Sequence, residues 1–159
     1  MGNLLLFTDG SMNAQLHFGY GAYLLLHEYE FSSDSLMCIP KVKRFENTSS
    51  TKLELETLIW ALEEVHLTCE KLIIYTDSQN VLGLAKRRSR LIQADYRSNK
   101  NRLLSNHELY RIFYRITEHL TFELVKVRGH LVSNEKNNID RIFAIVDRAA
   151  RKALREDGA

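Results

Sequence analysis

Short apolar runs separated by polar turns dominate the first third of the chain, as expected for β-strands. Residues 4–8 form an apolar run that leads into Asp-Gly-Ser, and residues 20–31 and 36–46 have the composition of two further strands. The polar sequence Ser-Ser-Asp-Ser at 32–35 lies between the last two and is typical of a turn. We therefore predict three sequential antiparallel strands.

The period of the pattern then changes. Within residues 47–67, leucine or isoleucine recurs with the spacing of a helix at positions 55, 58, 59 and 62. A strand is predicted at 72–76, a helix from about residue 78, an amphipathic helix at 106–120, a strand at 122–127 and a helix at 139–156. The order β-β-β-α-β-α-α-β-α predicts an α/β fold. Its mixed five-stranded sheet has three antiparallel strands, then two parallel ones, flanked by helices.

Composition narrows the class of protein only slightly. The chain has 159 residues, 45% hydrophobic and 26% charged, with no repeat or linker, so we expect one domain over 1–159. No apolar run approaches the length of a membrane helix, and the N-terminal residues lack the basic region of a signal peptide. Cys38 and Cys69 have no metal-like spacing and are expected to be reduced. We expect a cytoplasmic protein without membrane contact.

Three acidic residues occur where apolar ones would be expected. Asp9 and Asp77 each follow an apolar strand within a Thr-Asp pair, and Glu54 lies on the apolar side of its helix. For Asp77 the alternative is a helix cap. For Glu54 it is a buried ion pair with a lysine or arginine.

If these three carboxylates converge, their mutual repulsion and desolvation require a compensating cation. Oxygen ligands of this kind suit Mg²⁺, with Mn²⁺ as a possible substitute. Carboxylate clusters that hold two such ions serve in-line displacement at phosphorus. The pattern therefore predicts a metal-dependent nuclease.

Five motifs, in order, resemble the type 1 ribonuclease H family over almost the whole chain. They are TDGS at 8–11 with GYGAY at 19–23, TKLELETLIWALE at 51–63, YTDSQNV at 75–81, VKVRGH at 125–130 and VDRAARKAL at 146–154. The resemblance implies a ribonuclease H-like fold. It places Glu54 and Asp77 as catalytic carboxylates, Asp147 as a fourth carboxylate and His130 in a mobile loop.

The activity that the resemblance implies is endonucleolytic hydrolysis of the RNA strand in an RNA–DNA hybrid, by a monomer. The four carboxylates Asp9, Glu54, Asp77 and Asp147 would hold two Mg²⁺ ions about 4 Å apart. One ion would activate water and the other would stabilise the leaving 3′-oxygen. His130 would relay protons or assist product release; the alternative is an ordinary surface histidine.

Contacts with the hybrid are expected next to the acidic motifs. Asn13, Ser50 and Gln79 are candidates for the minor groove, with capping or turn formation as the alternative. Residues 86–102 contain seven Lys or Arg and one Asp, and they resemble in position the basic protrusion of the family. Arg87 and Arg88 are therefore expected to contact phosphates, although a solvated charged loop is the ordinary interpretation of such a run.

Two questions stay open at this point. Sixteen residues separate His130 from Asp147, which is long for the family and leaves Asp140 as an alternative fourth carboxylate. Small alanines after Asp147 favour that residue, because they let a helix pack close to the sheet. The second question is the substrate, since a nuclease or resolvase for DNA junctions, or a non-catalytic hybrid-binding module, could share this fold.

Overall fold

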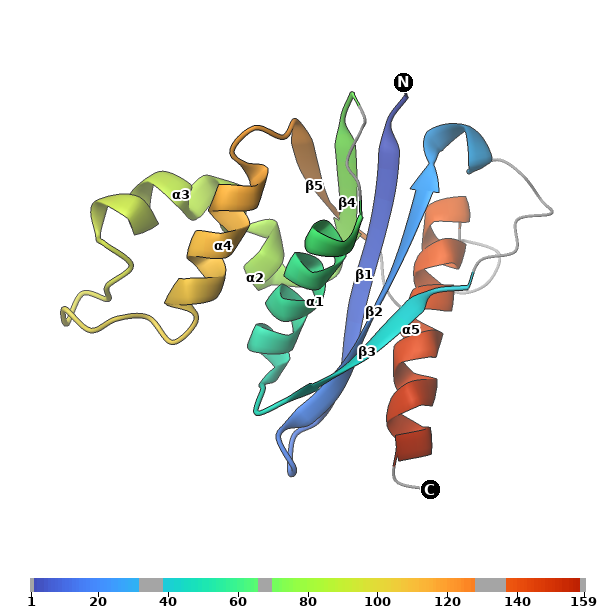
Figure 1. The fold of residues 1–159 in the computed structure, drawn as a ribbon, viewed down its shortest axis with the longest axis horizontal. Helices are drawn as coiled ribbons and strands as arrows, with labels where there is room; N and C mark the ends of the chain where they lie inside the picture. Colours follow the sequence, from blue (N-terminus) through green and yellow to red (C-terminus); the bar gives the residue numbers. More distant parts are fainter. Residues whose placement is uncertain (1, 32–38, 66–69, 128–136, 158–159) are drawn as a thin grey trace.

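The computed structural model describes residues 2–31, 39–65, 70–127 and 137–157. Within them lies a five-stranded sheet of order β3-β2-β1-β4-β5 (Figure 1). The strands are β1 (Leu4–Asn13), β2 (Phe18–His27), β3 (Lys41–Glu46), β4 (Leu72–Thr76) and β5 (Phe122–Lys126). The pairs β1–β2 and β2–β3 are antiparallel, whereas β1–β4 and β4–β5 are parallel. The predicted mixed sheet is confirmed.

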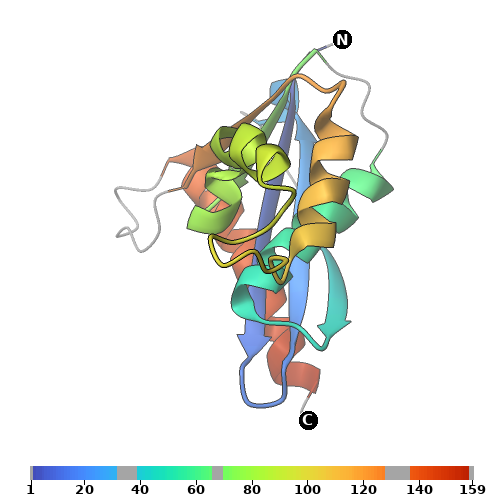
Figure 2. The ribbon, with the colours of Figure 1, turned by 90° about the vertical axis from the view of Figure 1, so that its left-hand side faces the viewer.

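Helices cover both faces of the sheet. Helices α1 (Ser50–Glu64) and α4 (His107–Thr117) lie on one face, and α5 (Asn138–Asp157) lies on the other (Figures 1 and 2). Side chains of β1 alternate between the two cores: Leu4 and Leu6 pack with α1 and α4, whereas Leu5 and Phe7 pack with α5. Among the residues described, no helix combines the length and apolar character needed to cross a membrane.

Strand boundaries differ from the prediction at three points. β1 continues through Asp9 as far as Asn13, because β2 pairs with it along this whole stretch and Phe18 is buried opposite Asn13. β2 ends at His27 and a short 3₁₀ turn, η1 (Glu28–Glu30), follows. β3 begins only at Lys41, and the predicted turn at 32–35 lies outside the described residues.

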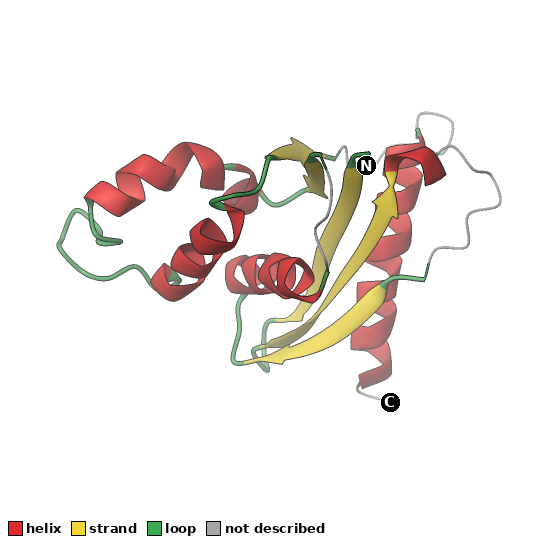
Figure 3. Ribbon diagram, turned by 45° about the horizontal axis from the view of Figure 1, so that its top comes forward, coloured by secondary structure: helices red, strands yellow, loops and turns green. Residues whose placement is uncertain are grey.

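The basic segment contains more helix than we predicted. After β4 the chain forms α2 (Gln79–Leu82) and α3 (Leu84–Gln93), then a loop that leads to α4. Helix α3 ends where Asp95 and Tyr96 adopt positive φ angles of 50° and 58°, and their N–H groups bond the carbonyls of Ile92 and Leu91. Figure 3 shows α3, this loop and α4 projecting from the side of the sheet away from β3.

Glycines let α1 approach the sheet closely. Gly10 and Gly21 are directly paired across β1 and β2. A Cβ atom at Gly21 would lie 2.1 Å from Oγ1 of Thr57, a fully buried α1 residue whose hydroxyl donates to the Leu53 carbonyl at 2.7 Å. Helix α1 therefore rests on backbone at this point.

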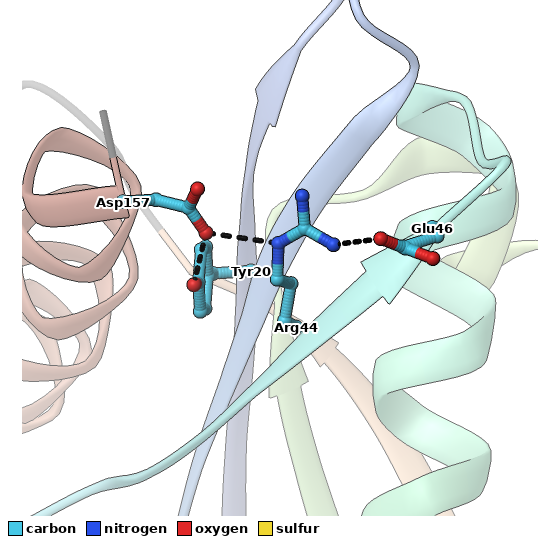
Figure 4. Close-up of polar contacts among 4 residues, drawn as sticks. All are labelled: Tyr20, Arg44, Glu46 and Asp157. Carbon is cyan, nitrogen blue, oxygen red and sulfur yellow. Dashed lines mark hydrogen bonds and ion pairs between the residues drawn. The ribbon is translucent and has the colours of Figure 1, made fainter.

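The last turn of α5 is tied to the sheet by polar contacts (Figure 4). The hydroxyl of Tyr20 in β2 donates to Asp157, and Nε of Arg44 in β3 donates to the same carboxylate oxygen at 2.8 Å. Arg44 also pairs with Glu46 of its own strand. These contacts hold the C-terminal end of α5 against β2 and β3.

Candidate active site

The edge that β1 shares with β4 positions the first two carboxylates. Parallel pairing stops at Phe7 and Tyr75, and β4 itself ends at Thr76. Asp9 lies two residues beyond the last pair, and Asp77 follows the end of β4. Our prediction that both strands end at their acidic residue is right for β4 and wrong for β1, which continues along β2. Asp9 is 4% exposed, in the interior of a strand.

Glu54 reaches the same edge from α1. The backbone N–H of Gly10 donates to its carboxylate, and Oε2 is buried without a hydrogen-bond partner. One oxygen from each of Asp9, Glu54 and Asp77 lies within 4.8 Å of the others. Among the described residues, no lysine or arginine forms an ion pair with Glu54. The alternative of a buried ion pair is therefore wrong within that part of the chain.

The cap of α2 is made by Ser78. Its hydroxyl accepts a hydrogen bond from the Val81 N–H at 3.3 Å. The Ser78 N–H in turn donates to Oγ1 of Thr76 at 3.1 Å. The capping role considered for Asp77 thus belongs to its neighbour, and the Asp77 carboxylate faces the cluster.

The two acids of α5 have different surroundings. Asp147 hydrogen-bonds to Asp9, consistent with Asp9 sharing the α5 face of β1 with Leu5 and Phe7. Asp140 instead forms a reciprocal cap at the helix start: it accepts from the Asn137 N–H at 3.3 Å and donates its own N–H to Asn137 Oδ1 at 2.9 Å. Nine helical residues, Asn138 to Val146, precede Asp147, so the long spacing after residue 130 is largely helix.

In the absence of a metal ion, burial and mutual repulsion disfavour the ionised forms of Asp9 and Glu54. Burial, the hydrogen bond that protonated Asp9 donates to Asp147, and the charges of Glu54 and Asp77 raise the pKa of Asp9 to about 9. Burial, followed by repulsion from Asp77, raises the pKa of Glu54 to about 8. Near neutral pH both groups keep a proton unless a cation replaces it.

These residues fit a divalent metal ion. They offer several hard oxygen donors close together, one of them a buried oxygen without any other partner. Within the described ranges, no lysine or arginine pairs with Asp9 or Glu54, and burial and mutual repulsion raise the pKa of both. When bound, such an ion supplies positive charge that ionises the carboxylates and polarises water or a phosphate oxygen.

The predicted substrate contacts are spread more widely than the sequence suggested. Oδ1 of Asn13 accepts from the Leu16 N–H at 3.1 Å, which is the turn-forming role considered for it. Asn13 is four strand residues from Asp9, or about 13 Å. Ser50 and Gln79 are exposed first residues of α1 and α2. The cap of α1 is Ser49, whose hydroxyl accepts from the Lys52 N–H at 3.2 Å, so Ser50 does not have that role.

The two predicted arginines differ in their surroundings. Arg87 is half-buried and donates to the backbone carbonyl and side chain of Asn80, at 2.5 and 3.1 Å. These contacts bind α3 to α2. Arg88 is exposed, and its guanidinium lies 5.9 Å from the ring centre of Tyr114. Both contacts with phosphate stay predictions, with Arg88 the better placed of the two.

The structure leaves one predicted residue undescribed and contains one feature that the sequence did not predict. His130 lies outside the described residues, as do Cys38 and Cys69. A cavity of about 430 Å³ between the starts of α1 and α4 was not anticipated. Its lining is polar or basic: His17, Asn47, Thr48, Ser49, Lys52, Ser105 and Asn106. Only tertiary structure brings these three segments together, although the Ser-Ser-Thr-Lys run was a visible sign of a helix start.

The fold and the cluster define an α/β protein with a carboxylate site suited to a divalent cation. A scan against protein families matches residues 1–155 to the RNase H family. The chain belongs to that family, and the expected ribonuclease H-like fold is confirmed. No curated protein matches the chain.

Solved structures show the same fold at low sequence identity. The native protease–reverse transcriptase of prototype foamy virus matches with a TM-score of 0.75 and 13% identity, over 94% of this chain and 20% of that one. LC9-RNase H1, described as a type 1 RNase H with the type 2 active-site motif, matches with a TM-score of 0.72 and 14% identity, over 96% and 72%. A foamy viral protease–reverse transcriptase in complex with double-stranded DNA matches with a TM-score of 0.64 and 9% identity, over 93% of this chain and 92% of that one. The present chain thus spans only a fifth of the native foamy virus protein.

Proposed function

We propose that this protein is an endoribonuclease that hydrolyses the RNA strand of RNA–DNA hybrids with two divalent metal ions, Mg²⁺ in the first instance. The observation that carries the proposal is the convergence of Asp9, Glu54 and Asp77 within 4.8 Å, with Asp147 against Asp9. Membership of the RNase H family supports it.

The residues of the cluster have distinct tasks in this proposal. Asp9, Glu54, Asp77 and Asp147 would hold the ions, which polarise the scissile phosphate and its attacking water when bound. The Gly10 N–H keeps Glu54 aimed at Asp9. Burial of Asp9 and of Oε2 of Glu54 excludes bulk water from one side of the site, so these carboxylates interact more strongly with a cation there than they would in solvent.

The surroundings of the cluster suit a nucleic-acid backbone. Ser50 precedes Glu54 by one helical turn and therefore shares its side of α1. The cavity beside it contains Lys52 and His17 and receives the N-terminal ends of α1 and α4, which favour anions. The exposed basic residues of α3, including Lys86, Arg88 and Arg90, extend the positive surface. Hybrid recognition would then follow backbone shape and 2′-hydroxyl groups rather than sequence.

A substrate panel tests the proposal. Cleavage of an RNA–DNA hybrid, duplex RNA, duplex DNA and a four-way DNA junction should be compared in Mg²⁺ and in EDTA. We expect cleavage of the hybrid alone, in its RNA strand, and only with Mg²⁺. Preferential cleavage of the junction would favour a resolvase, and hybrid binding without cleavage would favour a binding module.

Loss of a metal ligand should separate catalysis from binding. Asp77→Asn should lower hybrid cleavage by at least about a hundredfold, as expected for disturbing a metal site. It should leave the circular dichroism spectrum and hybrid affinity nearly unchanged. Normal cleavage by a folded Asp77→Asn variant would show that the cluster is not the active site.

The basic surface can be tested by the salt dependence of binding. Arg88→Gln combined with Arg90→Gln should weaken hybrid binding and reduce the salt slope by about one unit per lost phosphate contact. Arg141→Gln with Arg155→Gln removes the same charge from exposed positions of α5 and should leave the slope nearly unchanged. Equal effects of the two pairs would mean that α3 has no specific role. Arg87→Ala is less informative, because it should loosen α2 and α3.

A further inference from the structure

Asp147 has a cationic partner one helical turn further along α5, the arginine Arg151. Arg151 donates from Nε to Oδ1 at 3.2 Å, and its terminal nitrogen lies 2.8 Å from Oδ2. The two groups are one helical turn apart, and the pair is bidentate. Within the described part of the chain, Asp9 and Glu54 have no such partner.

The same carboxylate is also offset from the compact group of three. One oxygen from each of Asp9, Glu54 and Asp77 lies within 4.8 Å of the others, whereas Asp147 lies outside this group and contacts Asp9. A metal ion held in part by Asp147 must therefore share or displace the Arg151 guanidinium. An ion held by the other three meets no equivalent competitor at Asp9 or Glu54.

We propose that Arg151 is a built-in competitor of the metal ion for Asp147, which weakens ion binding at the position that Asp147 serves. The inference rests on the proposed function, since it assumes that Asp147 is a ligand. Arg151 is half-exposed (58% for its side chain, 28% for that of Asp147), so the competition is modest in size.

Calorimetric titration of the free protein with MgCl₂, without nucleic acid, tests this. In Arg151→Gln the Mg²⁺-binding step that Asp147→Asn removes should become about threefold tighter at low salt, with any other step unchanged. Arg151→Lys keeps the charge but loses the bidentate geometry. Its Mg²⁺ affinity at this step should lie between those of the wild type and Arg151→Gln. High salt should reduce the difference between wild type and Arg151→Gln.

Matched variants separate direct contact from general charge. Arg148→Gln removes the same charge next to Asp147 in sequence without a hydrogen bond to it, and it should shift the Asp147-dependent step less than Arg151→Gln does. In an Asp147→Asn background, Arg151→Gln should produce no further change, because the carboxylate in competition is already gone.

The outcomes distinguish this inference from the proposed function. Weaker Mg²⁺ binding in Arg151→Gln would overturn it, by showing that Arg151 holds Asp147 in place for the ion. Equal shifts in Arg148→Gln and Arg151→Gln would also overturn it while leaving hybrid cleavage by the wild type intact. Absence of Mg²⁺ binding and of hybrid cleavage in the wild type would overturn the proposed function, and this inference with it.

Discussion

Helix α1 carries two glutamates with opposite environments. Glu54, near its start, is half-buried beside other carboxylates, has a buried oxygen without a partner and has its pKa raised to about 8. Glu64, at its end, accepts hydrogen bonds from Lys41 at 2.7 Å, Tyr23 at 2.6 Å and Trp60 at 2.8 Å. Lys41 first, then Tyr23 and Trp60, lower the pKa of Glu64 to about 2.

The difference separates a structural carboxylate from a candidate catalytic one. Donors satisfy Glu64, which joins α1 to β2 and β3 and has no capacity to spare for a ligand. Glu54 has too few hydrogen-bond donors for both of its oxygens. The folded protein is therefore locally destabilised there, and a bound cation would relieve this. Four predictions test this contrast, from the largest expected effect to the smallest.

Catalysis should depend on one of these glutamates and not on the other. Glu54→Gln should lower hybrid cleavage at least about a hundredfold, because it removes a charged metal ligand. Glu64→Gln should cleave at nearly the wild-type rate at a temperature where it is folded. Single-turnover cleavage assays in saturating Mg²⁺ measure both. Similar losses of cleavage in the two variants would show that the two glutamates do not differ in their importance for catalysis.

Stability should change in the opposite sense. In EDTA at pH 8, Glu54→Gln should raise the free energy of unfolding by about 1–3 kcal/mol, since its amide can donate to the surrounding carboxylates. Glu64→Gln should lower the free energy of unfolding, because the amide pairs less well with Lys41. Urea unfolding followed by circular dichroism provides the comparison. A lower free energy of unfolding in Glu54→Gln would show that the Glu54 carboxylate does not destabilise the metal-free protein.

The pH dependence of stability should reveal the two sites in different windows. Without metal, Asp9 and Glu54 keep protons in the native state that the unfolded chain releases above about pH 4, so Tm should fall as pH rises from about 5 to 9. Glu64 has a lowered pKa, so its contribution is present above about pH 4.5 and is lost as pH falls towards 2. Differential scanning fluorimetry in EDTA and in Mg²⁺ measures both. Mg²⁺ should abolish the alkaline trend, and a trend unchanged by Mg²⁺ would argue against metal binding there.

The smallest effects should come from the individual donors of Glu64. Tyr23→Phe removes the hydroxyl of a buried side chain and should lower Tm more than Lys41→Met, which removes an exposed charge. Neither should alter Mg²⁺ affinity. Thermal unfolding of the two variants side by side tests the order, and a larger loss in Lys41→Met would show that the ion pair dominates.

Hydrophobic periodicity alone determined most of the architecture. The leucine spacing in α1, the apolar run of β4 and the stripe of α5 each predict their own element, because burial acts on every side chain of one face. The five motifs then indicated the family. Boundaries were less accessible: β1 runs on past Asp9 because β2 pairs with it, and pairing depends on a partner strand rather than on local composition.

Three acidic candidates, Asp9, Glu54 and Asp77, were also available from sequence, since carboxylates next to apolar runs are conspicuous. The fourth came from the family resemblance, which left Asp140 as the alternative to Asp147. Tertiary structure decided how they are used. Asp140 and Asp147 have nearly the same helical phase, and only the position of the helix start assigns one to a cap and the other to Asp9. Likewise Glu54 and Glu64 are both glutamates in one helix, but strands distant in the chain supply Glu64 with the donors Tyr23 and Lys41 and place Glu54 beside Asp9 and Asp77. Sequence determines which groups carry charge, whereas the packing of remote elements determines whether that charge is neutralised.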